Sequence, residues 1–210
     1  MTIYKKIKSV VASGVLATTI AIGGCAETRP FGNLRAYHDA RWNSDATLIA
    51  GASNLPLGAK LFTTTDVKMD GDSIGDPYNE TRLSKRGSYG FGAAIEYNRD
   101  FGKPKGATRL GAIYEPDLSK ILDNTKIGLK FFPVSTQNKG IQLGLYGIKE
   151  FGDNRIDGFL DYNFDPKKIV TEIQYGRKIS ENLYGIVEGR YNGLAKTDRS
   201  GIGIGLQWDF

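Results

Sequence analysis

The sequence predicts an all-β protein, an antiparallel meander β-barrel of about ten strands that crosses a membrane. First, large apolar residues recur at every second position in segments of about ten residues, a spacing that places them on one face of a strand. Second, charged residues and many glycines occupy the alternate positions. Third, turn-rich links such as Asp165-Pro166-Lys167 separate the segments, and short links of this kind join antiparallel neighbours.

The start of the chain, residues 1–25, has the form of a secretory signal peptide. Three lysines lie among residues 5–8, an uncharged stretch of small and apolar residues covers 9–24, and small residues follow at a cleavage-like site. The uncharged stretch is short and rich in Gly and Thr for a membrane anchor. We therefore predict an exported protein whose residues 26–210 form a single β-barrel domain.

The only cysteine of the chain, Cys25, lies at the predicted cleavage site, and two modes of cleavage fit. Ile22-Gly23-Gly24-Cys25 resembles the lipobox of bacterial lipoproteins, a family in which this cysteine becomes the lipidated N-terminus. Ordinary cleavage after Ala26 fits as well, because Gly24 and Ala26 are small. In either case a single cysteine excludes a disulfide within one chain.

The apolar rows of the remaining chain predict the strands. Nine rows begin at Leu57, Tyr89, Leu110, Ile127, Ile141, Ile156, Ile169, Leu183 and Ile202. A further strand in 46–52 or 34–40 gives a best count of ten, and eight or twelve also fit because bacterial single-chain barrels have even strand numbers. With ten strands the longest loop, residues 70–87, falls at the end that holds both termini, where such barrels usually have short turns. The sequence assigns no role to segments 27–45 and 70–87.

The residues between the apolar ones indicate which face of the strands points inward. This second face carries many glycines, which weaken a water-exposed strand but suit a crowded lumen. Tyr and Trp gather near the ends of the apolar rows, as in the aromatic girdles of membrane barrels. We therefore place the apolar rows in lipid, and not inside as in a soluble lipocalin-type barrel. The predicted lumen-lining residues are Lys60, Asp66, Lys68, Glu96, Arg109, Lys130, Asp157, Asp161, Glu172, Glu188 and Arg190.

With these features the chain resembles the bacterial outer-membrane β-barrel proteins over nearly all of residues 26–210. In that group the barrel assembly machinery reads a C-terminal strand that ends in Phe, and Leu206, Trp208 and Phe210 match this assembly signal. The resemblance implies an outer-membrane location, with outer-membrane lipid and the assembly machinery as partners. It names no solute, because one fold serves many functions.

Several other classes of function find no support in the sequence. The net charge of +5 falls to +2 without residues 1–24, which hold three lysines and no acid, so no basic patch indicates nucleic-acid binding. Residues 70–76 resemble a calcium loop only in part, because Ile74 takes a ligand position. The single histidine, His38, has no recognisable catalytic partner. We predict no catalytic residue, no cofactor and no metal, and hence no enzyme.

The functional prediction is a small pore or transport-related channel. The nearly balanced acids and bases of the lumen indicate mutual ion pairs, which fit either a polar constriction or a filling of the barrel. The alternative is therefore a non-conducting structural or interaction protein, with lipid-anchoring through Cys25 as one form of it. A lipid-modifying enzyme is the third option.

Overall fold

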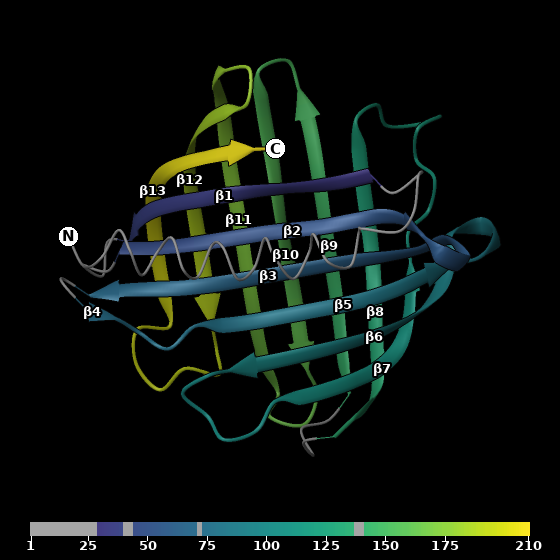
Figure 1. Cartoon of the computed structure of the whole chain (residues 1–210), viewed down its shortest axis with the longest axis horizontal. Coiled ribbons are helices and arrows are strands. Elements are labelled where there is room, and N and C mark those ends of the chain that lie inside the picture. Colours follow the sequence, from purple (N-terminus) through teal and green to yellow (C-terminus); the bar gives the residue numbers. More distant parts are fainter. Residues whose placement is uncertain (1–28, 40–43, 71–72, 137–140) are drawn as a thin grey trace.

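The strands of the protein form one closed antiparallel sheet, a barrel seen from the side in Figure 1. The computed structural model describes residues 29–39, 44–70, 73–136 and 141–210, and the predicted signal peptide lies outside these ranges. The described wall strands are β1 (Arg29–Asp39), β2 (Ser44–Leu55), β3 (Ala59–Asp70), β5 (Tyr78–Arg86), β6 (Phe91–Asp100), β7 (Ala107–Tyr114), β8 (Thr125–Ser135), β9 (Gln142–Phe151), β10 (Asn154–Asn163), β11 (Lys168–Ser180), β12 (Leu183–Asn192) and β13 (Ser200–Asp209). A two-residue strand, β4 (Ser73–Ile74), pairs with the end of β3. No helix in these ranges is long and apolar enough to span a membrane.

The barrel closes between β1 and β13. Their pairing runs from Asn33 opposite Asp209 to Asp39 opposite Gly203, and the other wall strands pair in chain order. Backbone hydrogen bonds of 3.2 and 3.0 Å between Gly32 and Phe210 extend this seam. A closed sheet leaves no open edge, which is what a wall in hydrocarbon requires. The predicted fold class, an all-β antiparallel meander barrel, is confirmed.

The described wall has twelve strands, which was within the predicted range but above the best count of ten. Two differences account for this. Both N-terminal segments are strands, β1 and β2, where one had been expected. In addition, β5 lies within residues 70–87, which were expected to be a loop. Its outward positions hold Asn79, Thr81, Leu83 and Lys85, so no apolar row marks it in the sequence.

The added strands also remove the conflict over the long loop. We call the end at which β1 begins and β13 ends end A, and the opposite end, end B. The tight turns 56–58, 87–90, 152–153 and 181–182 lie at end A together with one longer loop, 115–124. Because β5 is a strand, the connection that follows β3 lies at end B. Short turns beside the start of β1 and the end of β13 are the arrangement of outer-membrane barrels, whose periplasmic turns are short.

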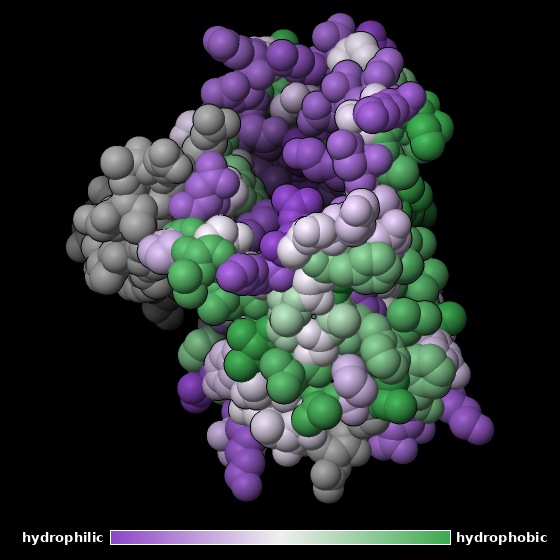
Figure 2. All heavy atoms as spheres, turned by 90° about the vertical axis from the view of Figure 1, so that its right-hand side faces the viewer, coloured by the Kyte–Doolittle hydropathy of each residue, from purple (hydrophilic) through white to green (hydrophobic). Residues whose placement is uncertain are grey.

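Side chains alternate between the two faces of the wall. In β8, for example, Ile127, Leu129 and Phe131 point outward and are exposed, whereas Lys130 and Phe132 point inward and are buried. Figure 2 shows hydrophilic residues around a hollow, with hydrophobic residues on the flanks beside and below it. The wall therefore separates an apolar outer surface from a polar interior, as a barrel in lipid requires.

Candidate functional site

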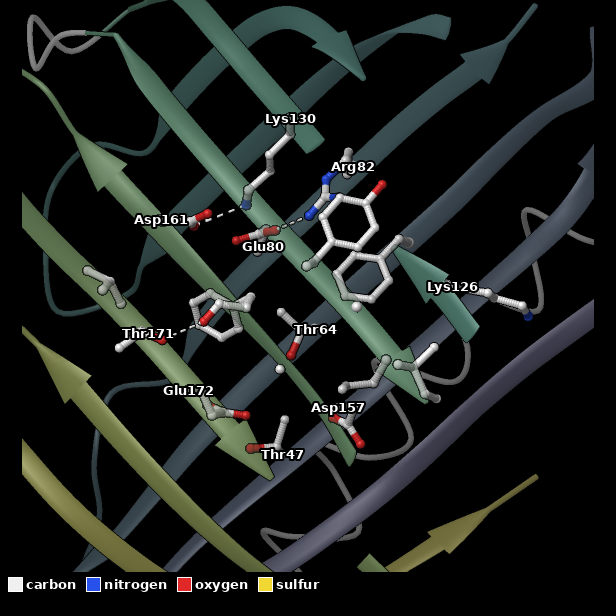
Figure 3. Close-up of a pocket in the computed structure, with 18 of the residues that line it drawn as sticks. Thr47, Thr64, Glu80, Arg82, Lys126, Lys130, Asp157, Asp161, Thr171 and Glu172 are labelled. Atoms are coloured by element: carbon white, nitrogen blue, oxygen red, sulfur yellow. Dashed lines mark hydrogen bonds and ion pairs between the residues drawn. The ribbon is translucent and has the colours of Figure 1, made fainter. Parts of the chain in front are cut away.

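The interior of the barrel holds a cavity of about 2280 Å³. Its lining includes Gly58 and Asp117 from the turns of end A, and Lys103 and Lys196 from the loops of end B. The cavity therefore extends along the lumen from one end of the barrel to the other. Figure 3 shows part of it, with side chains from strands on several sides of the wall.

The residues predicted to line the lumen lie on the inner side of the wall. Nine of them line the cavity: Lys60, Asp66, Lys68, Arg109, Lys130, Asp157, Asp161, Glu172 and Arg190. The other two, Glu96 and Glu188, are buried and form ion pairs with cations of that lining. The alternation of the strands brings all of them to one face, and the closure of the sheet brings them together.

A first group of paired charges, the Glu96 cluster, consists of Glu80, Arg82, Glu96, Arg109, Lys130 and Asp161. The carboxylate of Glu96 on β6 is fully buried and accepts from Arg82 Nε at 3.1 Å and Arg109 Nη1 at 3.0 Å. Lys130 Nζ lies 3.7 Å from Glu96 and 3.0 Å from Asp161. In Figure 3 the amine of Lys130 points toward Asp161, beside the pair formed by Glu80 and Arg82. One buried carboxylate thus lies within 4 Å of three cations. Its negative charge offsets the cost of burying their positive charges.

Two aromatic rings hold Arg82 in place. Its guanidinium lies 5.2 Å from the ring centre of Phe62 on β3 and 5.5 Å from that of Tyr146 on β9. Contacts of this kind are attractive because the ring face is negative. Since β5 and β9 are not neighbours in the sheet, the contact with Tyr146 reaches across part of the lumen. Arg82 and Tyr146 therefore narrow the cavity.

A second group, the Arg35 cluster, consists of Arg35, Asp45, Asp157, Glu172, Glu188 and Arg190. Arg35 of β1 donates to Asp157 Oδ1 at 2.8 Å and to Glu172 Oε1 at 3.2 Å. Arg190 of β12 pairs with Asp45 of β2 at 3.0 Å and also with Glu188 and the hydroxyl of Tyr37. Apart from Arg190–Glu188, which lies within β12, these pairs join strands that are not adjacent in the sheet. The Arg35 cluster therefore braces β1 and β2 against β10–β12 through the lumen.

Glycines make room for these long side chains. A Cβ at Gly144 would lie 2.3 Å from Asp161 Oδ1 and 2.4 Å from Lys130 Cε, where the ion pair of these two residues passes. At Gly203 a Cβ would approach the Tyr37 ring to 2.9 Å. The inward glycines thus leave space for the long side chains of a crowded lumen. The expectation of such crowding was the reason for placing the glycine-rich face inside.

The charges of the lumen are balanced. Twelve basic and twelve acidic residues line the cavity in the described part of the chain, and Glu96 and Glu188 behind the lining add two acids. The interior cations of both clusters lie within 4.0 Å of carboxylates. The lumen therefore presents alternating charges of both signs and a small excess of acids.

Sequence reasoning missed several lumen residues, among them Arg35, Asp45, Glu80, Arg82 and Arg155. All of them line the cavity. Four of them lie on β1, β2 and β5, three strands for which the best count of ten had allowed only one. The alternation of Glu80, Arg82 and Arg86 with uncharged residues was a signal for β5, because a lumen face repeats at every second position.

The remaining predicted positions lie outside the lumen. Cys25 and part of the calcium-like segment 70–76 lie outside the described residues. Leu206, Trp208 and Phe210 point outward and are about half exposed. His38 Nδ1 lies 3.5 Å from Ser44 Oγ on the exposed outer face. In the described part of the chain no group of three His, Cys, Asp or Glu side chains could hold a metal ion.

Comparison with solved structures supports the architecture. The barrel resembles the KdgM porin in complex with disordered oligogalacturonate (TM-score 0.56, 16% identity, 86% of this chain and 99% of that chain covered). It also resembles outer membrane phospholipase A from Escherichia coli (TM-score 0.59, 13% identity, 92% and 96% covered). At such low identity the likeness concerns the fold alone. No protein-family model and no curated protein matches the chain.

Proposed function

We propose that the protein is an outer-membrane pore through which small hydrophilic solutes diffuse. The observation that carries this proposal is the cavity of about 2280 Å³, which residues of both barrel ends line and whose wall is charged and polar. Water and solutes are compatible with such a lining, whereas the outer face suits hydrocarbon. The KdgM porin and outer membrane phospholipase A share the fold, which supports the outer membrane as the location.

The proposal includes the route to that membrane. Residues 1–25 would direct export, the assembly machinery would insert the barrel, and end A with its tight turns would face the periplasm. The arrangement of the turns supports this orientation, because four of the five connections at end A are tight turns, with 115–124 as the exception, whereas connections 101–106 and 193–199 lie at end B.

The charge pattern of the lumen narrows the class of solute. A polyanion needs an excess of accessible cations, and the cations of the Glu96 and Arg35 clusters are already paired with carboxylates. The KdgM porin was solved with oligogalacturonate, an acidic oligosaccharide, but this lumen has as many acids as bases along its lining. We therefore propose small neutral or zwitterionic solutes, with a weak preference for cations over anions because of Glu96 and Glu188.

The alternative is a non-conducting structural protein. The observation that supports it is that side chains such as Arg35 and Arg82 reach across the lumen. An enzyme finds less support. The contact between His38 and Ser44 is long at 3.5 Å and lies at an exposed position, whereas a catalytic base and its nucleophile need a close, positioned contact. The prediction that the protein is not an enzyme is thus kept as part of the proposal.

The experiment is single-channel recording in planar bilayers, with a salt gradient to measure ion selectivity. We expect discrete conductance steps and a reversal potential that indicates weak cation preference. Arg82→Ala removes a side chain that narrows the lumen and should raise the conductance, whereas Lys85→Ala, on the outer face of the same strand, should leave it unchanged. Wild-type protein that inserts but never conducts would establish the structural alternative, and hydrolysis of phospholipid vesicles would establish the enzymatic one.

A further inference from the structure

Three cations line the cavity at end A, and we call them the end-A cations: Lys60, Arg86 and Lys126. Lys60 lies near the start of β3, Arg86 ends β5, and Lys126 lies near the start of β8. Since β3 and β8 begin at end A and β5 ends there, the three side chains share one mouth of the barrel. Their charges act on one another, because Lys60 lies within electrostatic range of both Arg86 and Lys126.

The carboxylate that these cations share is Glu115, the first residue after β7. Its Oε2 lies 3.1 Å from Arg86 Nη1, and its Oε1 accepts a hydrogen bond of 2.5 Å from the hydroxyl of Tyr146. Asp117 of the same loop also lines the cavity, but its exposed carboxylate accepts from the backbone N–H of Ser119. Glu115 thus compensates Arg86 and shows that this mouth accommodates a carboxylate group.

The two lysines of the group are left without such a partner. The ion pairs of the described chain reach Arg86 but not Lys60 or Lys126. Lys60 Nζ lies 5.3 Å from the ring centre of Phe31, a contact that does not neutralise its charge. Figure 3 shows Lys126 apart from Lys130, which is paired with Asp161. Two ammonium groups at this mouth therefore retain their capacity to bind an anion.

The excess of positive charge at end A has a counterpart deeper in the same cavity. The Arg35 cluster, defined above, holds two arginines and four carboxylates, an excess of two acids. Charges of one sign on a low-dielectric wall focus the field and concentrate ions of the opposite sign beside them. The lumen as a whole is balanced, but its basic and acidic excesses lie in different places, and a solute with charges of both signs fits this separation.

We propose that the end-A cations form a subsite for the anionic group, a carboxylate or a phosphate, of a zwitterionic solute in the lumen. The inference rests on the proposed pore and narrows its class of solutes. Each lysine ammonium is a point charge with three donors, so Lys60 and Lys126 suit either anionic group. The acids of the Arg35 cluster attract the cationic group of the same solute, which orients its anionic end toward end A.

The test is calorimetric titration of the folded barrel in detergent with three probes that differ in one group. The probe γ-aminobutyrate carries a carboxylate, γ-aminopropylphosphonate a phosphonate, and γ-aminobutanamide a neutral amide. We expect at least one of the two anionic probes to bind about tenfold more tightly than the amide, and the tighter of the two identifies the preferred group. Added salt should weaken this binding, because it screens the lysine charges.

Variants locate the subsite. Lys60→Gln combined with Lys126→Gln should weaken binding of the preferred anionic probe about tenfold. Lys68→Gln is the matched control, because Lys68 lies on the same inward face of β3 but near end B, and it should leave the affinity unchanged. A heat-modifiable band shows for each variant that the barrel is folded.

Three results would each overturn the subsite: equal affinity for the amide and both anionic probes, unchanged affinity in the double variant, or an equal loss in Lys68→Gln. Single-channel recording of the wild type separates this inference from the proposed function. A barrel that binds the anionic probe but never conducts would refute the pore alone, whereas one that conducts without binding it would refute the subsite alone.

Discussion

The two parts of the barrel wall, β1–β5 and β6–β13, differ on the outside and are alike on the inside. Outside, each strand of β6–β13 presents a Phe, Tyr or Trp among its aliphatic residues, whereas the described positions of β1–β5 present aliphatic, small and polar residues and none of these three. Inside, both parts contribute to the same ion-pair clusters: Arg82 of β5 meets Glu96 of β6, and Arg35 of β1 meets Asp157 of β10. The two parts of the wall thus differ in their outer side chains, and the inner charges hold them together.

The largest effect is expected where the inner wall joins the two parts. Glu96→Ala leaves Arg82, Arg109 and Lys130 without the buried acid they share. Breaking a buried ion pair by removing one partner costs about 3–5 kcal/mol, and we expect a loss of unfolding free energy of that order. The measurement is denaturant unfolding from lipid vesicles.

Glu96→Gln is the matched control for this variant. It keeps the size of the side chain and its bond with Asn98, so its cost should be smaller than that of Glu96→Ala. An unchanged stability of Glu96→Ala would show that the inner wall does not depend on this acid, and that Glu80 and Asp161 suffice for the three cations.

A smaller effect is expected on the outer wall of β6–β13, and neighbouring residues of β9 measure it. Leu143 points outward and is exposed, whereas Gln142 points inward and lies 3.4 Å from Asp161. A cation on the lipid face costs about 2–4 kcal/mol at the bilayer midplane and less toward the interfaces. Leu143 is the second residue of β9, so Leu143→Arg should cost a measurable amount below that range. Gln142→Arg should cost less, because Asp161 is beside it. Equal losses in vesicle-folding titrations would contradict the assignment of the two faces.

The same difference between the two parts explains what the sequence could predict. In strands such as β8 and β13, the outward residues form apolar rows with a period of two, Ile127–Phe131 and Ile202–Phe210. This period predicted the strands, the direction of each face and the charged residues of the lumen. On β5 the outward Asn79, Thr81 and Lys85 erased this signal, and the strand with its lumen residues was missed. Periodicity detects a strand through the contrast between its two faces, and this contrast is weak on β5.

The partners of the lumen charges could not be predicted for a different reason. Arg35 and Asp157 are 122 residues apart, and Arg190 and Asp45 are 145 apart. Which inward side chains meet depends on the strand number, the register and the closure of the sheet together. In a barrel of ten strands instead of twelve, different residues would face each other across the lumen. The alternation therefore predicts which charged side chains point inward, but not which of them form ion pairs.

The smallest effect on stability is expected at the rim of the outer wall, at Phe210. Its backbone pairs with Gly32 and its ring lies 5.6 Å from that of Trp208, at end A of the barrel. A lysine in place of an interfacial residue costs about 0–1 kcal/mol, because its amine reaches the headgroups, so Phe210→Lys should unfold from vesicles almost like the wild type.

The efficiency with which the barrel is assembled in cells is measured separately from this stability. In the outer-membrane proteins that this chain resembles, the assembly machinery reads such a Phe, and we expect the heat-modifiable, membrane-inserted fraction of Phe210→Lys to fall more than that of a substitution in loop 193–199. A variant that is normal in vesicles but poorly inserted in cells would assign Phe210 to assembly, whereas equal behaviour in both assays would leave it as an ordinary residue of the rim.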